Sequence, residues 1–141
     1  MKIKKKILAI VYRKEKDETQ FLALRNNSTN TVHGGDYYFV VTGGVENGEE
    51  LQAAVKREIE EETGIKNILN VTDLNKSCEY TCAGEGDFLC REAYFLVEIT
   101  GEVLHLNEEN VEYQWLEKSD FVDLIAWNDK KELQLILNNF F

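Results

Sequence analysis

Glu58, Glu61 and Glu62 have the residue type and the spacing to bind a metal ion. A helix through this stretch, at about 100° per residue, gathers its apolar residues on one face. Those apolar residues are Leu51, Ala54, Val55 and Ile59. Glu58 and Glu62 fall within this face and Glu61 lies at its edge, although carboxylates are rarely buried unpaired and repel one another when crowded. A hard divalent cation would relieve this conflict, because it prefers oxygen ligands; the alternative is a solvated acidic helix end.

The three glutamates belong to a longer pattern of fixed spacing over residues 43–65. Its defined positions are Gly43, Glu49, Arg57, Glu58, Ile59, Glu61, Glu62, Gly64 and Ile65. The pattern resembles the Nudix box of the Nudix hydrolases at every defined position and needs no insertion. The resemblance implies that water attacks phosphorus in a nucleoside diphosphate linked to another group, X.

The resemblance also implies roles for the residues of the box. The three helical glutamates would be metal ligands, with Mg2+ as the cofactor and Mn2+ as a substitute. Arg57 and Glu49 would brace the loop against the helix, and Arg57 and Glu58 belong to the expected catalytic set. Gly43 and Gly44 would let the loop backbone approach metal ions and the substrate phosphates.

A further acidic ligand is expected from a loop after the box. Glu109 lies six residues before Trp115, where related enzymes place such a ligand. Glu108 and Glu112 are competing candidates, and a solvated acidic turn is the structural alternative. The general base differs between Nudix subfamilies, so Glu61 and Glu109 are both retained as candidates.

Two residues outside the box are candidates for contacting the substrate. Tyr38 could offer its ring to a base or pterin, and simple strand packing is the alternative. Arg25 could reach a phosphate oxygen, since a guanidinium suits that geometry, or it could form a surface salt bridge.

Three segments outside the helix suggest a branch of the family. VTGG before the helix, ENVEYQWL at 109–116 and AWNDKKEL at 126–133 resemble the dATP pyrophosphohydrolase and dihydroneopterin triphosphate pyrophosphatase branch. Diadenosine tetraphosphate hydrolases, which share an E-x5-W-L arrangement, are the enzymatic alternative. A non-catalytic nucleotide-sensing Nudix module is a third hypothesis, but such modules usually lose box carboxylates that this sequence keeps.

Alternating and helical apolar patterns predict the elements that position these residues. Strands are predicted at residues 3–12, 20–25, 37–42, 67–79, 88–99 and 112–116, with a short edge piece at 103–106. Helices are predicted at 49–62, which Gly64 ends, at 119–125, which Ser119 caps, and at 129–138, which Asp129 caps. The expected class is α/β, with the α/β/α sandwich and central mixed sheet of Nudix proteins.

Length and charge limit the possible domain organisation and partners. The 141 residues suit a single Nudix domain over 1–141. A net charge of −10 argues against duplex nucleic acid as a partner and leaves a small nucleotide-like substrate. No apolar run approaches the ~20 residues that span a membrane, so a cytoplasmic protein is expected. Three cysteines, an odd number, are consistent with reduced thiols, and the oligomeric state stays open, a homodimer included.

Overall fold

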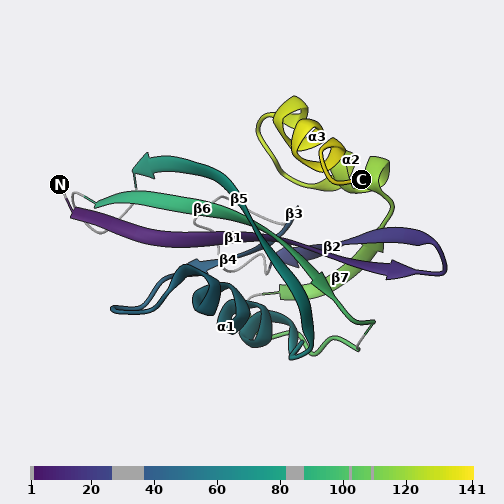
Figure 1. The fold of residues 1–141 in the computed structure, drawn as a ribbon, viewed down its shortest axis with the longest axis horizontal. Coiled ribbons are helices and arrows are strands. Elements are labelled where there is room, and N and C mark those ends of the chain that lie inside the picture. Colours follow the sequence, from purple (N-terminus) through teal and green to yellow (C-terminus); the bar gives the residue numbers. More distant parts are fainter. Residues whose placement is uncertain (1, 27–36, 82–87, 102, 109) are drawn as a thin grey trace.

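The computed structural model describes residues 2–26, 37–81, 88–101, 103–108 and 110–141. The described strands are β1 (Lys2–Glu15), β2 (Glu18–Asn26), β3 (Tyr38–Phe39), β4 (Val41–Gly44), β5 (Ile68–Thr81), β6 (Phe88–Ile99) and β7 (Asn110–Leu116). The described helices are α1 (Leu51–Thr63), α2 (Lys118–Leu124) and α3 (Lys130–Asn138). Helix α1 covers one face of the sheet and α2 and α3 cover the other, which confirms the predicted α/β sandwich (Figure 1). None of these helices has the length and apolarity needed to cross a membrane.

Strand β1 is the centre of the sheet. It pairs in parallel with β6 and antiparallel with β2 and β4, which makes the sheet mixed. The main strand order is β3-β2-β1-β6-β5, with β4 beside β1 and β7 beside β2. Two strands pair with the same edge of β1, one after the other. Strand β4 pairs with residues 6–9 of β1, and β2 pairs with the last residues of β1. This arrangement brings the end of β4, where the Nudix box begins, beside the first half of β1.

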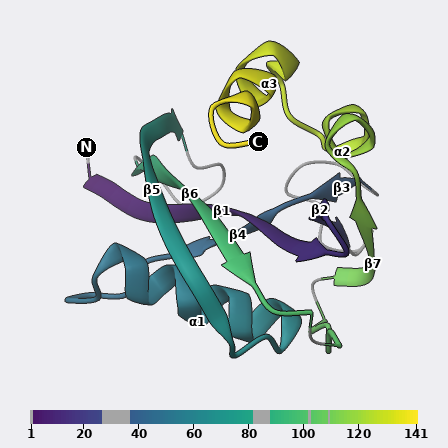
Figure 2. The same cartoon turned by 45° about the vertical axis from the view of Figure 1, so that its right-hand side comes forward.

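The two faces of the sheet carry separate cores, because side chains alternate along a strand. In β1, Ile7 and Ala9 pack with the α1 side, whereas Leu8 and Ile10 pack with the α2 and α3 side. The view in Figure 2 shows the sheet between these two helical layers. Side chains of neighbouring residues in one strand therefore lie in different cores, on opposite faces of the sheet.

The structure corrects the predicted elements in three places. The strand expected at 37–42 is two strands, because β3 pairs with β2 whereas β4 pairs with β1. Ser119 does not cap α2; the N-cap position is Glu117. The described residues of the expected edge piece at 103–106 form no strand. By contrast, Asp129 caps α3 as predicted, since its side chain accepts hydrogen bonds from the backbone N–H groups of Lys131 and Glu132.

The cysteines differ from one another. Cys78 on β5 is a free, exposed thiol, as expected. Cys90 on β6 is buried and disulfide-bonded, so the expectation of reduced thiols is wrong for this residue. Cys82 lies outside the described residues.

Candidate active site

Helix α1 presents the residues of the box because its ends and its buried face are well defined. Its buried residues are Ala54, Val55, Ile59, Glu62 and Thr63. The helix ends at Gly64, whose φ of 76° is the left-handed conformation that glycine adopts without strain. A β-carbon at this position would also lie 3.1 Å from the β-carbon of His105. The predicted helix stop is therefore confirmed.

Gly43, at the end of β4, lies directly against the side chain of Glu58. A β-carbon at position 43 would overlap the carboxyl carbon and both carboxylate oxygens of Glu58. Burial raises the pKa of Glu58, the adjacent Arg57 guanidinium opposes that shift, and the nearby Glu61 charge adds to it. The Glu58 carboxylate is therefore partly removed from water and lies against the backbone of Gly43, which has no side chain.

Arg57 ties the loop to the helix. Its Nε and Nη2 atoms donate to the two carboxylate oxygens of Glu49, each at 2.9 Å, and Nη2 also donates to the Gly44 carbonyl oxygen at 2.8 Å. Its Nη1 atom donates to Glu58 at 2.9 Å and to Glu61 at 3.3 Å. The guanidinium lowers the pKa of Glu49 to about 2 through these hydrogen bonds. A two-pronged pairing of this kind fixes orientation as well as distance.

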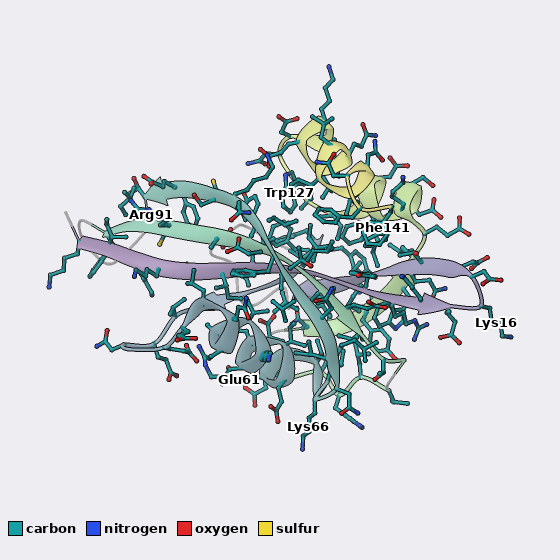
Figure 3. The ribbon with its side chains drawn as sticks, in the orientation of Figure 1. Lys16, Glu61, Lys66, Arg91, Trp127 and Phe141 are labelled. Carbon is teal, nitrogen blue, oxygen red and sulfur yellow. The ribbon has the colours of Figure 1, made fainter. Side chains whose placement is uncertain are left out.

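The three helical glutamates have the graded exposure that the helical spacing predicts. The exposed fraction is 5% for Glu62 and 13% for the Glu58 side chain, against 55% for the Glu61 side chain. Figure 3 shows Glu61 on α1, below the sheet. Within the described part of the chain, no three His, Cys, Asp or Glu side chains already converge on one point. The donor set nevertheless fits a hard cation, because it consists of crowded carboxylates of which two are largely withdrawn from water.

The stretch that follows β6 lies over the last turn of α1. The backbone N–H of His105 donates to the Thr63 carbonyl oxygen at 2.7 Å. The side-chain amide of Asn110 donates to Glu62 Oε1 at 3.3 Å. Sequence reasoning missed Asn110, although it directly follows Glu109, the residue proposed as a further ligand. Glu109 itself lies outside the described residues.

The two candidate substrate residues meet at Glu112. Arg25 Nη1 donates to Glu112 Oε1 at 2.6 Å, and the Tyr38 hydroxyl donates to the same oxygen at 2.8 Å. Gln114 then donates to the Tyr38 hydroxyl oxygen at 2.9 Å. Arg25 follows Leu24, which packs on the α1 side, so this polar group stands on the opposite face of the sheet. The structure therefore brings Arg25 and Tyr38 together, and these contacts of Glu112 are with them rather than with the box.

Comparison with known families decides the relationship. A family model described as the NUDIX domain matches residues 3–136 of the chain. The chain belongs to the Nudix family. Among curated proteins no match is found. Family membership confirms the enzyme class predicted from the box, a hydrolase of the nucleotide pyrophosphohydrolase type.

Solved structures show the same fold in Nudix proteins of distant sequence. A C. elegans Ap4A hydrolase is 20% identical with a TM-score of 0.74, and the match covers 96% of each chain. The E. coli dihydroneopterin triphosphate pyrophosphohydrolase is 21% identical with a TM-score of 0.73, covering 98% of this chain and 99% of that one. A Nudix protein from Listeria monocytogenes is 21% identical with a TM-score of 0.77, covering 95% and 91%. These similarities support the fold described above.

Proposed function

We propose that this Nudix protein is a Mg2+-dependent hydrolase of a nucleoside triphosphate or a related nucleoside diphosphate-X compound. Water would attack phosphorus and break the pyrophosphate linkage. Residues 1–141 act as one catalytic domain in this proposal. Its substrate is a small molecule, and no nucleic acid or membrane partner is required.

The observation that carries the proposal is the burial of the Glu58 carboxylate. It lies between the backbone of Gly43 and the guanidinium of Arg57. Gly43 leaves room for this carboxylate, and Arg57 holds one of its oxygens at 2.9 Å. Removing a charged carboxylate from water is unfavourable, and an ordinary helix end would leave it solvated. A buried carboxylate such as Glu58 is therefore a candidate for function.

The metal ligands in this proposal are Glu58, Glu61, Glu62 and Glu109. A bound Mg2+, or Mn2+ in its place, would supply electrostatic stabilisation of the charge that develops on the phosphate oxygens. Glu61 and Glu109 are the candidate general bases, each able to take a proton from the attacking water on a carboxylate oxygen. Gly43 and Gly44 would let the loop backbone approach the phosphates.

The remaining residues in the proposal hold other groups in place and do not take part in the reaction itself. Arg57 orients Glu58 and fixes the loop through Glu49, so its contribution to turnover is indirect. Arg25 and Tyr38 would contact the substrate on the other face of the sheet. The sequence resemblance of residues 109–116 and 126–133 supports the dATP pyrophosphohydrolase and dihydroneopterin triphosphate pyrophosphatase branch.

The test is hydrolysis of a substrate panel at alkaline pH with Mg2+ or Mn2+. The panel holds nucleoside triphosphates, dihydroneopterin triphosphate, diadenosine tetraphosphate, ADP-ribose and nucleotide sugars, with release of phosphate and pyrophosphate measured. Pyrophosphate released from one triphosphate far faster than from the others would support the proposed branch. Activity on diadenosine tetraphosphate alone would keep the chemistry and overturn the branch. If no compound of the panel is hydrolysed although the protein still binds metal, a nucleotide-sensing module would be favoured.

Matched variants of α1 test the roles of the glutamates. Glu61→Gln and Glu62→Gln should each abolish turnover while the protein stays folded by circular dichroism. Glu60→Gln is the control, because Glu60 lies on the same helix but is exposed and points away from the buried face. Near-native turnover in both Glu61→Gln and Glu62→Gln would overturn the assignment.

A further inference from the structure

Glu62 is the most buried of the three helical glutamates, and a residue outside the Nudix box holds its carboxylate. Glu62 is 5% exposed, and its side chain lies within hydrogen-bond reach of Glu58. The side-chain amide of Asn110, 48 residues further along the chain, donates to Glu62 Oε1 at 3.3 Å. The first residue of β7 thus contacts a proposed metal ligand on α1.

The stretch between β6 and β7 is anchored on the end of α1 before the chain enters β7. Leu104 is buried in the core on the α1 side. The backbone N–H of His105 donates to the Thr63 carbonyl oxygen at 2.7 Å. The backbone N–H of Asn107 donates to the Glu62 carbonyl oxygen at 3.4 Å. These donors satisfy carbonyl groups that the last turn of a helix leaves unpaired. Figures 1 and 2 show this stretch passing beside the end of α1 on its way to β7.

A β-bulge at the start of β7 turns Asn110 toward α1. In a regular strand, side chains two residues apart share a face, so Asn110 would lie on the same side of the sheet as Glu112. In the pairing of β7 with β2, Glu112 is opposite Arg25 and Asn110 is opposite Asn26. Val111 is therefore an extra residue in β7. Bulges redirect side chains and are common beside active sites. Glu112 accordingly contacts Arg25 on one face, whereas Asn110 reaches the end of α1 on the other.

An amide is suited to orienting a metal ligand. Asn110 donates through an uncharged N–H, so it fixes the position of the Glu62 carboxylate without neutralising its charge. Arg57 differs, because its guanidinium forms an ion pair with Glu58. One hydrogen bond uses only part of the acceptor capacity of a carboxylate, so Glu62 can be held by Asn110 and still bind a cation. Groups that hold metal ligands in this way tune the affinity of the site for its metal.

We propose that Asn110 is a positioning residue that orients Glu62 for binding the metal ion of this hydrolase. The inference rests on the proposed function, in which Glu62 is a metal ligand. The bulge at Val111 and the anchored stretch after β6 deliver the Asn110 amide to that ligand. Without the amide, Glu62 loses a contact that fixes its orientation, and the metal site is less well organised before the metal binds.

The test measures the affinity of the substrate-free protein for Mn2+ from the electron paramagnetic resonance signal of the free ion. Asn110→Ala removes the donor, and Asn110→Leu removes it while keeping a side chain of similar shape. Loss of a group that holds a metal ligand costs about tenfold to a hundredfold in affinity, so both variants should bind Mn2+ more weakly by that factor. The Mg2+ concentration that gives half-maximal turnover should rise by a similar factor.

Val111→Ala is the matched control, because Val111 is the neighbouring residue and is 53% exposed. This variant should bind Mn2+ as tightly as the wild type. A double-mutant cycle then tests the link between Asn110 and Glu62. In a Glu62→Gln background, Asn110→Ala should cause little further loss of Mn2+ affinity, because the ligand that it orients is already changed.

Two results would overturn the inference. The first is wild-type Mn2+ affinity in Asn110→Ala and Asn110→Leu, with or without a lower urea midpoint, since Asn110 would then have only a structural role. The second is an undiminished loss of Mn2+ affinity when Asn110→Ala is added to Glu62→Gln, because Asn110 would then act independently of Glu62.

Metal binding and turnover separate this inference from the proposed function. If the wild type hydrolyses no substrate but its Mn2+ affinity depends on Asn110, the proposed function fails and the role of Asn110 stands. If substrates are hydrolysed but neither the Mn2+ affinity nor the Mg2+ dependence changes in the Asn110 variants, only the further inference fails. A wild type that binds no Mn2+ would also overturn it.

Discussion

The carboxylate of Glu58 occupies the space that a β-carbon on Gly43 would need. A side chain at residue 43 would therefore have to displace the Glu58 carboxylate, so glycine here matters for a steric reason that involves the helix and not for its own backbone angles. The contact couples the end of β4 to α1 at the point where the candidate metal ligands begin.

Gly43→Ala should displace Glu58 and disturb the loop. Because the overlapping atoms are the end of a flexible side chain, the unfolding free energy should change little, whereas turnover should fall because the Glu58 carboxylate is moved from its place. Gly44→Ala is the control for stability, because among the described residues its added methyl would meet Lys4 alone, at 4.0 Å. Urea unfolding and turnover of both variants check the prediction. Wild-type turnover in Gly43→Ala would contradict the prediction.

Arg57→Lys should keep the positive charge but lose the two-pronged hold on Glu49 and the link to Gly44. Because misplacing a reacting group by about 1 Å can cost about a hundredfold, we expect a loss in kcat of that order with a smaller change in KM. Steady-state kinetics measures this split, with Lys56→Arg as the control on the exposed side of α1. A fall in stability with unchanged kcat would show that Arg57 has only a structural role.

The ion pair of Glu49 should make stability depend on acid pH. The Arg57 guanidinium lowers the pKa of Glu49 from 4.5 to about 2, so the folded state favours the charged carboxylate. This contribution is fully present above pH 4.5 and disappears as the pH falls toward 2. The difference in unfolding free energy between the wild type and Glu49→Gln should therefore be constant near neutral pH and shrink below pH 4.5. Thermal melts across this range test the trend, and a difference that grows toward low pH would contradict it.

Lys130→Met should destabilise the C-terminal helices. The Lys130 ammonium donates to the Val122 carbonyl oxygen at 2.6 Å, to that of Asp123 at 3.3 Å and to that of Ile125, which satisfies carbonyl groups at the end of α2. Losing charged hydrogen bonds of this type costs about 1–3 kcal/mol of unfolding free energy. Lys131→Met, at an exposed neighbouring position, should leave that free energy near the wild-type value. Equal urea midpoints for the two variants would refute the prediction.

The sequence by itself determined the local features of this protein. Helical periodicity placed Glu58 and Glu62 on the buried face of α1, and Gly64 marked its end, because both depend on residues within a few turns. The fixed spacing of the box was enough to identify the family. The Asp129 cap and the β1–β2 hairpin were equally predictable, since each needs only neighbouring residues.

Only the tertiary structure decided which distant residues meet. Strand register set β3 against β2 and β4 against β1, which divided a segment that looks continuous in sequence. The bulge in β7 and the packing of the stretch after β6 brought Asn110 to Glu62. Local sequence cannot specify such contacts, because a shift of one residue in pairing would turn every side chain of a strand to the other face.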